Sequence, residues 1–172
     1  VTANWTIFSG TTGLDVEPGT LIYTDYPVTG GKLAYGAGTA DARRDFTASN
    51  VAYASFLIQA DKLPTTTSDY CVSFNPTAYA TRFFLSGEAA NGSFLCGISS
   101  AAGNLTWTGS EFATGVVHRI VLKFDGISSN FNLWVNPTGT ETTPDVSVSP
   151  AGAATAFSFA IRQGTFFQNG GA

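Results

Sequence analysis

The sequence predicts an all-β fold, a two-sheet antiparallel β-sandwich or jelly roll. Gly, Pro and Asn interrupt the chain at short intervals, and the runs between them have the length of strands. No window keeps the i, i+3, i+4, i+7 apolar spacing of an amphipathic helix over three turns. Runs of this length, spaced roughly 8 to 12 residues apart, are typical of a sandwich.

The clearest element is a hairpin between Arg119 and Pro137. Apolar residues alternate along both of its strands, and they are Ile120, Leu122, Phe124, Phe131, Leu133 and Val135. Asp125-Gly126 begins the reversal between the strands. We therefore expect these apolar side chains to face the core.

The remaining strands are marked by similar runs between turn residues. Val51–Gln59 is apolar on both faces, which predicts a central strand covered on both sides. Asp15–Gly19 and Glu141–Asp145 contain Pro and are expected to be loops. In chain order the predicted strands are Thr6–Phe8, Leu21–Tyr23, Leu33–Tyr35, Arg43–Thr47, Val51–Gln59, Tyr70–Phe74, Thr81–Leu85, Phe94–Ile98, Leu105–Thr108, Val117–Phe124, Phe131–Val135, Val146–Val148 and Ala156–Gln163.

Three segments carry a family resemblance. Arg119–Gly126 followed by Asn132–Pro137 resembles the late hairpin of the concanavalin-A-like, laminin-G-like jelly rolls of secreted and surface bacterial proteins, of the planctomycete and verrucomicrobial type. Ala42–Phe46 and Val51–Ile58 resemble that family's "ARR-F" and "VY-SFL" segments in the same order. The resemblance runs from about Leu14 to Gln163 and implies one β-sandwich domain over residues 1–172.

The resemblance also predicts a missing strand. Domains of this family continue past the equivalent of Ile161–Gly164 into a last strand, whereas this chain stops at Ala172. We therefore expect an open sheet edge beside Ala156–Gln163. Unpaired edges invite a strand from a neighbouring molecule.

Composition limits the partners. Eight basic and twelve acidic side chains give a net charge of −4, and the cations are scattered, so no basic patch for nucleic acid is present in the sequence. Charged residues make up 12%, a low fraction that is common in exported β-proteins. No apolar run reaches the length of a membrane span, about 18 to 20 residues. With no Met, even at position 1, the sequence fits an exported, trimmed protein, so an extracellular or cell-surface location is expected, although an arbitrary boundary within a longer chain would look identical.

Cys71 and Cys96 are the only cysteines. In an oxidising compartment an even pair in a small β-domain favours a disulfide. A plain meander would instead place a strand between them and separate them by about 9 to 10 Å, beyond the limit of about 7 Å for a bridge. Both alternatives stay open. A zinc site is excluded because two cysteines and one histidine do not supply four ligands.

No catalytic pattern is found in the sequence. A jelly-roll glycosidase needs two carboxylates on one strand, and the only close acidic spacings are Asp15 with Glu17, Asp41 with Asp45, and Glu141 with Asp145. We interpret these as loop and surface charges. His118 is the single histidine and no G-x-S-x-G elbow exists, so His118 is interpreted as a structural residue at a strand end. The protein is expected not to be an enzyme, with no cofactor.

Calcium sites and glycosylation sites are the two other kinds of site that the sequence offers. The resemblance implies that calcium can bind in a rim loop, and Asp15, Asp25 and Asp125 are candidate ligands, although no dense acidic run exists. Glycosylation sequons begin at Asn4, Asn91 and Asn104. In a bacterial protein we expect most sequons to stay unmodified.

Two classes of function follow. The first is a glycan-binding or adhesive module that recognises polysaccharide or glycoconjugate through loop aromatics or the concave sheet face, with Tyr23, Tyr26, Tyr79 and Trp107 as candidates; ordinary packing is the alternative for each. The second is a self-assembling surface or filament subunit that binds other copies of itself. Its donated strand would be the uncharged amino-terminal segment, with Val1, Trp5, Ile7 and Phe8. Glycoside hydrolysis is a third, weaker hypothesis.

Overall fold

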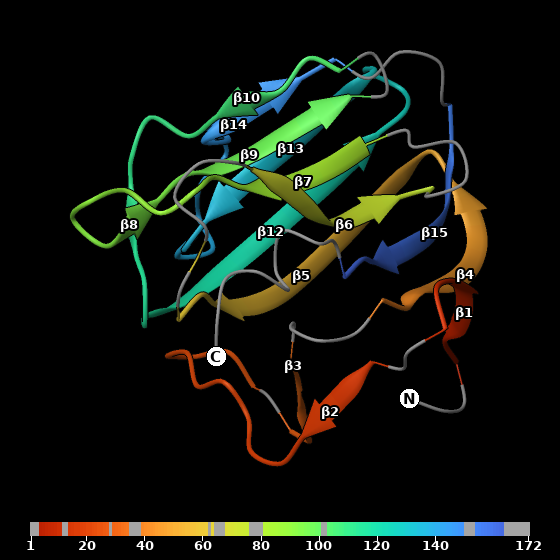
Figure 1. The fold of residues 1–172 in the computed structure, drawn as a ribbon. Helices are drawn as coiled ribbons and strands as arrows, with labels where there is room; N and C mark the ends of the chain where they lie inside the picture. The colour runs from red at the N-terminus through yellow and green to blue at the C-terminus, as the bar shows by residue number, and fades with distance from the viewer. Residues whose placement is uncertain are drawn as a thin grey trace.

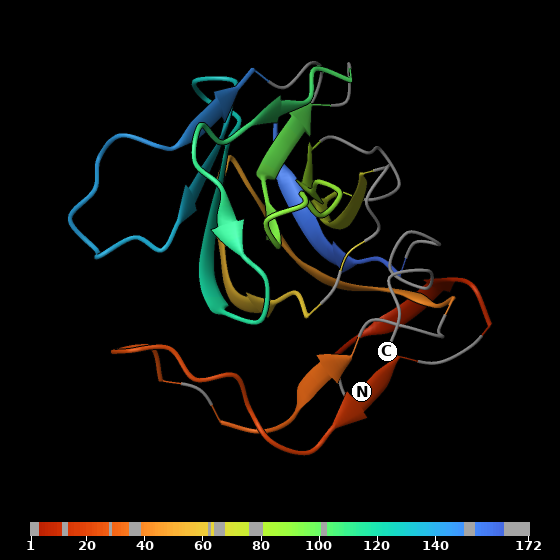
Figure 2. The same ribbon diagram turned by 60° about the vertical axis from the view of Figure 1, so that its left-hand side comes forward.

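The structure is a computed structural model, and it describes residues 4–11, 14–27, 29–34, 39–61, 63, 68–75, 81–100, 103–149 and 154–163. Within these ranges the regular elements are all strands, and every pairing is antiparallel. Two large sheets pack face to face (Figures 1 and 2). The prediction of an all-β antiparallel sandwich is confirmed.

The larger sheet has seven strands and faces the viewer in Figure 1. Its order is β1 (Thr6–Ser9), β4 (Asp41–Ser49), β15 (Ala156–Ile161), β6 (Asp69–Phe74), β7 (Thr81–Leu85), β9 (Cys96–Ser100) and β10 (Thr106–Trp107). The strands β6, β7 and β9 form the predicted meander, whereas β15 returns from the far end of the chain to lie between β4 and β6.

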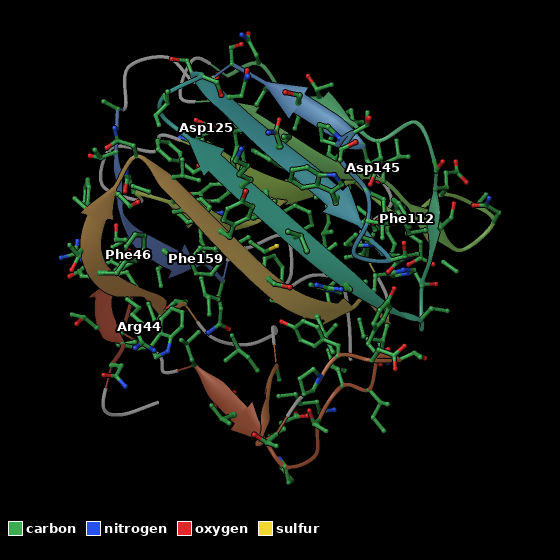
Figure 3. All side chains as sticks on the ribbon, turned by 180° about the vertical axis from the view of Figure 1, so that it is seen from behind. Arg44, Phe46, Phe112, Asp125, Asp145 and Phe159 are labelled. Atoms are coloured by element: carbon green, nitrogen blue, oxygen red, sulfur yellow. The ribbon has the colours of Figure 1, made fainter. Side chains whose placement is uncertain are left out.

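The second sheet has four strands and faces the viewer in Figure 3. Its order is β14 (Val146–Val148), β13 (Asn130–Val135), β12 (Val117–Asp125) and β5 (Val51–Gln59). Two small sheets complete the fold: β2 (Asp15–Glu17) with β3 (Lys32–Ala34), which lies apart from the sandwich in Figures 1 and 2, and β8 (Ser93–Phe94) with β11 (Phe112–Ala113).

The core lies between the two large sheets. The hairpin β12–β13 has the predicted buried face, and its register places Leu122 opposite Leu133 with both side chains fully buried. Phe74 of the larger sheet packs edge-on against Phe131 and at a tilt against Phe124, with centroids 6.1 Å apart in both pairs. The alternating pattern read from the sequence therefore marks the buried face correctly.

Asn136, the polar residue at the end of the hairpin, has a structural role. Asn136 follows β13 with a left-handed backbone, φ 56°, a conformation that Asn tolerates better than most residues. Its N–H donates to the Arg119 carbonyl (2.7 Å), and its Oδ1 accepts from the Arg119 N–H (2.9 Å). Its Nδ2 contacts His118 Nδ1 at 3.1 Å. The backbone and side chain of Asn136 thus join the start of β12 to the end of β13.

The prediction for Val51–Gln59 is wrong in one respect. The strand exists with the predicted bounds, but β5 is the edge strand of the four-stranded sheet. Phe56 faces the core, whereas Tyr53, on the outer face, is 65% exposed. Aromatic residues can read as buried in sequence because they are apolar, although their rings also cover the outside of a sheet.

The prediction of an open sheet edge beside Ala156–Gln163 is also wrong. β15 pairs with β4 on one side and with β6 on the other, so it is a central strand. The amino-terminal segment, expected to be donated to a neighbour, pairs within its own chain, because Ile7 of β1 lies opposite Ala42 of β4. Trp5 lines a cavity of about 160 Å³ together with Leu33 and Ile161. Trp5 and β1 therefore belong to the fold of their own chain, while Val1 lies outside the described residues.

Three segments differ in kind from the prediction. Leu21–Tyr23 forms no strand and contributes only the bridge between Tyr23 and Tyr26. Asp15–Glu17, expected in a loop, is the strand β2. Phe94–Ile98 is divided at Leu95, whose N–H donates to Ser86 Oγ (2.8 Å) and whose carbonyl accepts from the Ser86 N–H (2.9 Å). β8 consequently pairs with β11, while β9 pairs with β7.

Cys71 and Cys96 are free and buried, so the disulfide alternative is wrong. Cys71 is on β6 and Cys96 is on β9, and β7 lies between these strands. Two strand spacings exceed the reach of a disulfide. The alternative in which a meander strand separates the cysteines is therefore confirmed.

Candidate functional site

An aromatic row crosses the outer face of the seven-stranded sheet. Tyr70 of β6 lies opposite Phe84 of β7, Phe84 lies opposite Gly97 of β9, and Gly97 lies opposite Trp107 of β10. Directly opposed residues of an antiparallel sheet point to the same side. Because the neighbouring residues Phe83 and Leu85 are buried in the core, this row faces outward. We call Tyr70, Phe84 and Trp107 the aromatic row.

Glycine at position 97 allows the row to be continuous. The Trp107 ring lies across Gly97, where a Cβ atom would come within 2.5 Å of ring atom Cε3. The ring also meets Phe84 edge-on, with centroids 6.4 Å apart, and Phe84 lies 5.7 Å from Tyr70. All three rings are half-buried. Trp107 is thus supported from below and from one side while part of its ring stays exposed.

Arginines and small residues form a second row beside the first. In strand order this row contains Arg43, Ala160, Ser73, Arg82 and Ser99, each directly opposite the next. Ser73 and Ser99 are almost completely buried. The Ser99 Oγ atom has no hydrogen-bond partner among the described residues. The small side chains leave room for the two arginines along this face.

One end of the aromatic row is electrostatically organised. The Tyr70 ring has two guanidinium groups over it, Arg162 at 4.3 Å and Arg82 at 5.0 Å from its centroid. Arg162 Nη1 forms an ion pair with Asp69 Oδ1 (2.8 Å). Burial raises the pKa of the nearby Asp41 carboxyl above its usual value, and the hydrogen bond from the Gln163 N–H opposes this shift. The face thus combines apolar rings with donors and acceptors for hydroxyl groups.

A groove of about 600 Å³ lies elsewhere, between the turn at residues 22–25 and the start of β12. Its lining residues are Ile22, Tyr23, Thr24, Asp25, Val116, Val117, Arg119, Pro137 and Thr138. Arg119 alternates with the buried His118 and Ile120, so it lies on the outer face of the four-stranded sheet. The groove and the aromatic row are therefore on opposite faces of the sandwich.

Of the predicted glycan-binding residues, Tyr23 and Tyr26 pair in one β-bridge, whereas Trp107 lies on the opposite face of the sandwich. Trp107 belongs to the aromatic row, and Tyr23 lines the groove. Tyr26 has a structural role, because its hydroxyl donates to the Ser55 carbonyl (3.0 Å) and the Arg119 guanidinium lies 5.1 Å from its ring centroid. Tyr79 lies outside the described residues.

Sequence reasoning missed Tyr70, Phe84 and the arginines as members of one surface. The available signal was the alternation in β7, where Arg82 and Phe84 separate the buried Thr81, Phe83 and Leu85. Alternation shows that both side chains point away from the core. It does not show which strands lie beside β7, and the row depends on those neighbours.

The acidic pairs considered for catalysis have structural partners. Glu17 forms an ion pair with Lys32 (3.2 Å), and Asp45 forms one with Arg43 (3.3 Å). Asp145 Oδ2 accepts from the Val135 N–H at 2.7 Å. Glu141 accepts from the N–H groups of residues 138–140. Glu17, Asp45, Glu141 and Asp145 are therefore each engaged by a neighbouring group of the fold.

His118 is buried and closely packed. Its ring stacks edge-on with Phe94 (5.8 Å) and Phe112 (5.4 Å). Nε2 contacts the Ala113 carbonyl at 3.0 Å, and Nδ1 contacts Asn136 Nδ2 at 3.1 Å. Because a carbonyl only accepts and an amide NH₂ donates, these two contacts fit the tautomer with its proton on Nε2. The ring has no free nitrogen for catalysis, which agrees with a structural role.

The three calcium candidates do not converge. Asp15 lies on β2, Asp25 lines the groove, and Asp125 ends β12 (Figure 3). Asp125 Oδ1 accepts from the N–H groups of Ile127 and Ser128, and Oδ2 binds Lys123 Nζ at 2.9 Å. N–H donors and an ammonium group occupy the oxygens that a cation would need. Among the described residues, no group of three or more His, Cys, Asp or Glu side chains gathers as a metal site.

The sequon asparagines Asn4, Asn91 and Asn104 are all exposed. Asn91 Nδ2, the atom that would carry a glycan, donates to Glu111 Oε2 (3.0 Å). Ser93 of the same sequon is buried and donates to Asn91 Oδ1 at 2.6 Å. The folded structure therefore holds the second sequon in a closed hydrogen-bond cluster.

Comparisons with known proteins identify the fold. No protein-family model and no curated protein sequence matches the chain. A solved sialidase structure is similar with a TM-score of 0.60 and 16% identity over 94% of this chain, which spans only 13% of the sialidase chain. The globular domain of T. cruzi calreticulin is similar with a TM-score of 0.51 and 9% identity, covering 92% of this chain and 77% of that domain. The chain thus has a jelly-roll β-sandwich fold. Within its described part, no helix is long and apolar enough to cross a membrane.

Proposed function

We propose that the protein is a non-catalytic glycan-binding module of the laminin-G-like type, acting outside the cell, and that the aromatic row is its binding surface. The proposal rests on one observation. Tyr70, Phe84 and Trp107 lie side by side on one outward sheet face, with arginines and Asp69 beside them. Flat rings cover the apolar face of a pyranose, and charged groups bind its hydroxyls.

The fold supports this proposal only as a scaffold. Jelly-roll sandwiches carry many functions, so the argument rests on the side chains and not on the likeness to other structures. Ser73, Gly97 and Ser99 have small side chains or none, so they leave shallow depressions in the sheet surface between the larger side chains. A ligand lying across the strands would contact rings on one side and guanidinium groups on the other.

The test is retention of the folded protein by polysaccharides in affinity gel electrophoresis. A panel of neutral and acidic polysaccharides identifies a retaining one, and Trp107→Ala should then weaken binding by roughly 1 to 3 kcal/mol, by analogy with the cost of removing an aromatic ring on which a nucleic-acid base stacks. Tyr53→Ala is the matched control, because Tyr53 is 65% exposed on the outer face of the other sheet. Each variant is measured below its own unfolding temperature, since Trp107 also packs on Phe84.

Two results would count against the proposal. Equal retention of Trp107→Ala and the wild type would show that the aromatic row does not bind the glycan. Turnover of a polysaccharide or ester substrate, abolished by changing a single carboxylate, would show that the protein is an enzyme and not a binding module.

A further inference from the structure

The groove contains an arginine that lacks an acidic partner. No carboxylate of the described residues lies within ion-pair distance of Arg119, whereas Arg43 and Arg162 are paired with aspartates. Arg119 Nη1 makes a long bond to the Pro137 carbonyl (3.4 Å), and Nε is buried without a partner. A guanidinium has five N–H donors, so donors remain for a ligand.

The position of this guanidinium is restricted before any ligand arrives. It lies over the Tyr26 ring, and Tyr26 is itself held by the Ser55 carbonyl. Pro137 restrains it from a second direction. A charged donor that is already positioned loses little conformational entropy when it binds. The groove therefore presents a fixed positive charge.

The other walls of the groove limit the kind of anion. Ile22 and Val116 are 79% and 49% exposed, and they present apolar surface beside Arg119. Thr24, Asp25 and Thr138 add hydroxyl and carboxylate groups. A free inorganic anion would leave the apolar walls uncovered, and a neutral sugar would leave Arg119 unpaired. An acidic sugar satisfies both, because it combines an anionic group, hydroxyls and an apolar ring face.

We propose that this groove is a binding site for an acidic sugar residue, whose carboxylate or sulfate pairs with Arg119. Asp25 and Thr24 bind its hydroxyl groups, and Ile22 contacts its ring. The site is distinct from the aromatic row and lies on the other face of the sandwich, so the proposal does not depend on the function proposed for that row.

The experiment is calorimetric titration of the folded protein with three oligosaccharides of equal length. These are an oligogalacturonate, its neutral galactose counterpart and a sulfated galactose oligomer. The acidic ligands should bind at least about tenfold more tightly than the neutral one, as expected for a charge-assisted hydrogen bond. The difference between the carboxylated and the sulfated ligand identifies the preferred anion.

Two variants and a control locate the site. Ile22→Asp places a negative charge in the groove and should weaken acidic binding by about tenfold or more, as Arg119→Gln should. Ile22 is the sharper test, because it is 79% exposed and its replacement leaves the core intact, whereas Arg119 also supports Pro137 and Tyr26. Ile127→Asp is the control, since Ile127 is equally accessible (75%) in the turn after β12 and should bind like the wild type.

The outcomes separate the two sites. No binding of either acidic ligand, no preference over the neutral one, or unchanged binding by Ile22→Asp would overturn the groove proposal. Loss of acidic binding in Trp107→Ala alone would also overturn it, because the acidic ligand would then bind at the aromatic row. Loss of acidic binding in Ile22→Asp, with Trp107→Ala unaffected for every glycan, would support the groove and contradict only the function proposed for the row.

Discussion

At the scale of single residues, carboxylates stabilise the rim loops of this protein by accepting backbone N–H groups. Glu141 binds the N–H and the hydroxyl of Thr138 through Oε1 (2.7 and 2.6 Å), and Oε2 binds the N–H of Gly139 at 2.8 Å. These bonds lower the pKa of Glu141 to about 2. Hydrogen bonds from Ser128 and Lys123 similarly lower the pKa of Asp125 to about 2.

A carboxyl with a lowered pKa in the folded state links stability to pH. The contribution of Glu141 is complete above its ordinary pKa of 4.5 and is lost as the pH falls toward about 2, because protonation then favours the unfolded chain. We expect Glu141→Gln to have a lower unfolding temperature at pH 7 and a smaller further decrease between pH 4.5 and 2. Thermal unfolding followed by circular dichroism over this pH range measures both effects.

The control for this prediction is Glu17→Gln, which removes an exposed glutamate paired only with Lys32. Its unfolding temperature at pH 7 should stay close to that of the wild type, because an exposed ion pair contributes little to stability. A Glu141→Gln profile that is parallel to the wild type between pH 4.5 and 2 would show that these loop hydrogen bonds do not contribute to stability.

At the scale of elements, the hairpin β12–β13 forms the two central strands of the four-stranded sheet. Leu122 and Leu133 are directly opposed and fully buried against the other sheet. On the outer face, Val121 and Trp134 of the same hairpin are opposed and only half-buried. The two faces therefore differ in how much a truncation should cost.

Leu122→Ala or Leu133→Ala should each lower the free energy of unfolding by roughly 2 to 5 kcal/mol, the range for large-to-small changes in a packed core. Val121→Ala, on the outer face, should cost less than either. Urea denaturation with tryptophan fluorescence measures all three. A larger loss for Val121→Ala than for Leu122→Ala would contradict the assignment of faces.

At the scale of the whole molecule, the two cysteines report on the integrity of the sandwich. Burial raises the pKa of the Cys71 thiol to about 12 and raises that of Cys96 well above its usual value. The reactive thiolate is therefore scarce in the folded protein, and access is blocked as well. Both protections depend on the two sheets staying together.

A thiol reagent such as dithionitrobenzoate should thus react with neither cysteine in the folded protein and with both after unfolding in guanidinium chloride without a reductant. Absorbance of the released product counts the thiols. Rapid reaction in the folded state would show that the sheets open locally. Absence of thiols after unfolding would show that Cys71 and Cys96 are bridged.

Much of the fold was predictable from the sequence because side-chain alternation is a local property. The register of β12 with β13, the burial of Leu122 and the outward direction of Arg82 all follow from a period of two residues and a recognisable turn. Gly, Asn and Pro marked the ends of most strands for the same reason, since they act on the backbone within a few residues.

The order of the strands was decided only by the tertiary structure. The neighbours of a strand can lie more than thirty residues away in the sequence, as the pairing of Ile161 with Ala42 and Val72 illustrates. These distant segments decide whether Val51–Gln59 is central, whether Ala156–Ile161 has an open side, and whether Thr6–Ser9 pairs within its own chain. Both candidate sites have the same origin. Tyr70, Phe84 and Trp107 come from three strands, and Ile22 meets Arg119 from a distant turn. Sequence by itself determined which face each side chain takes, and packing of the two sheets decided which faces meet.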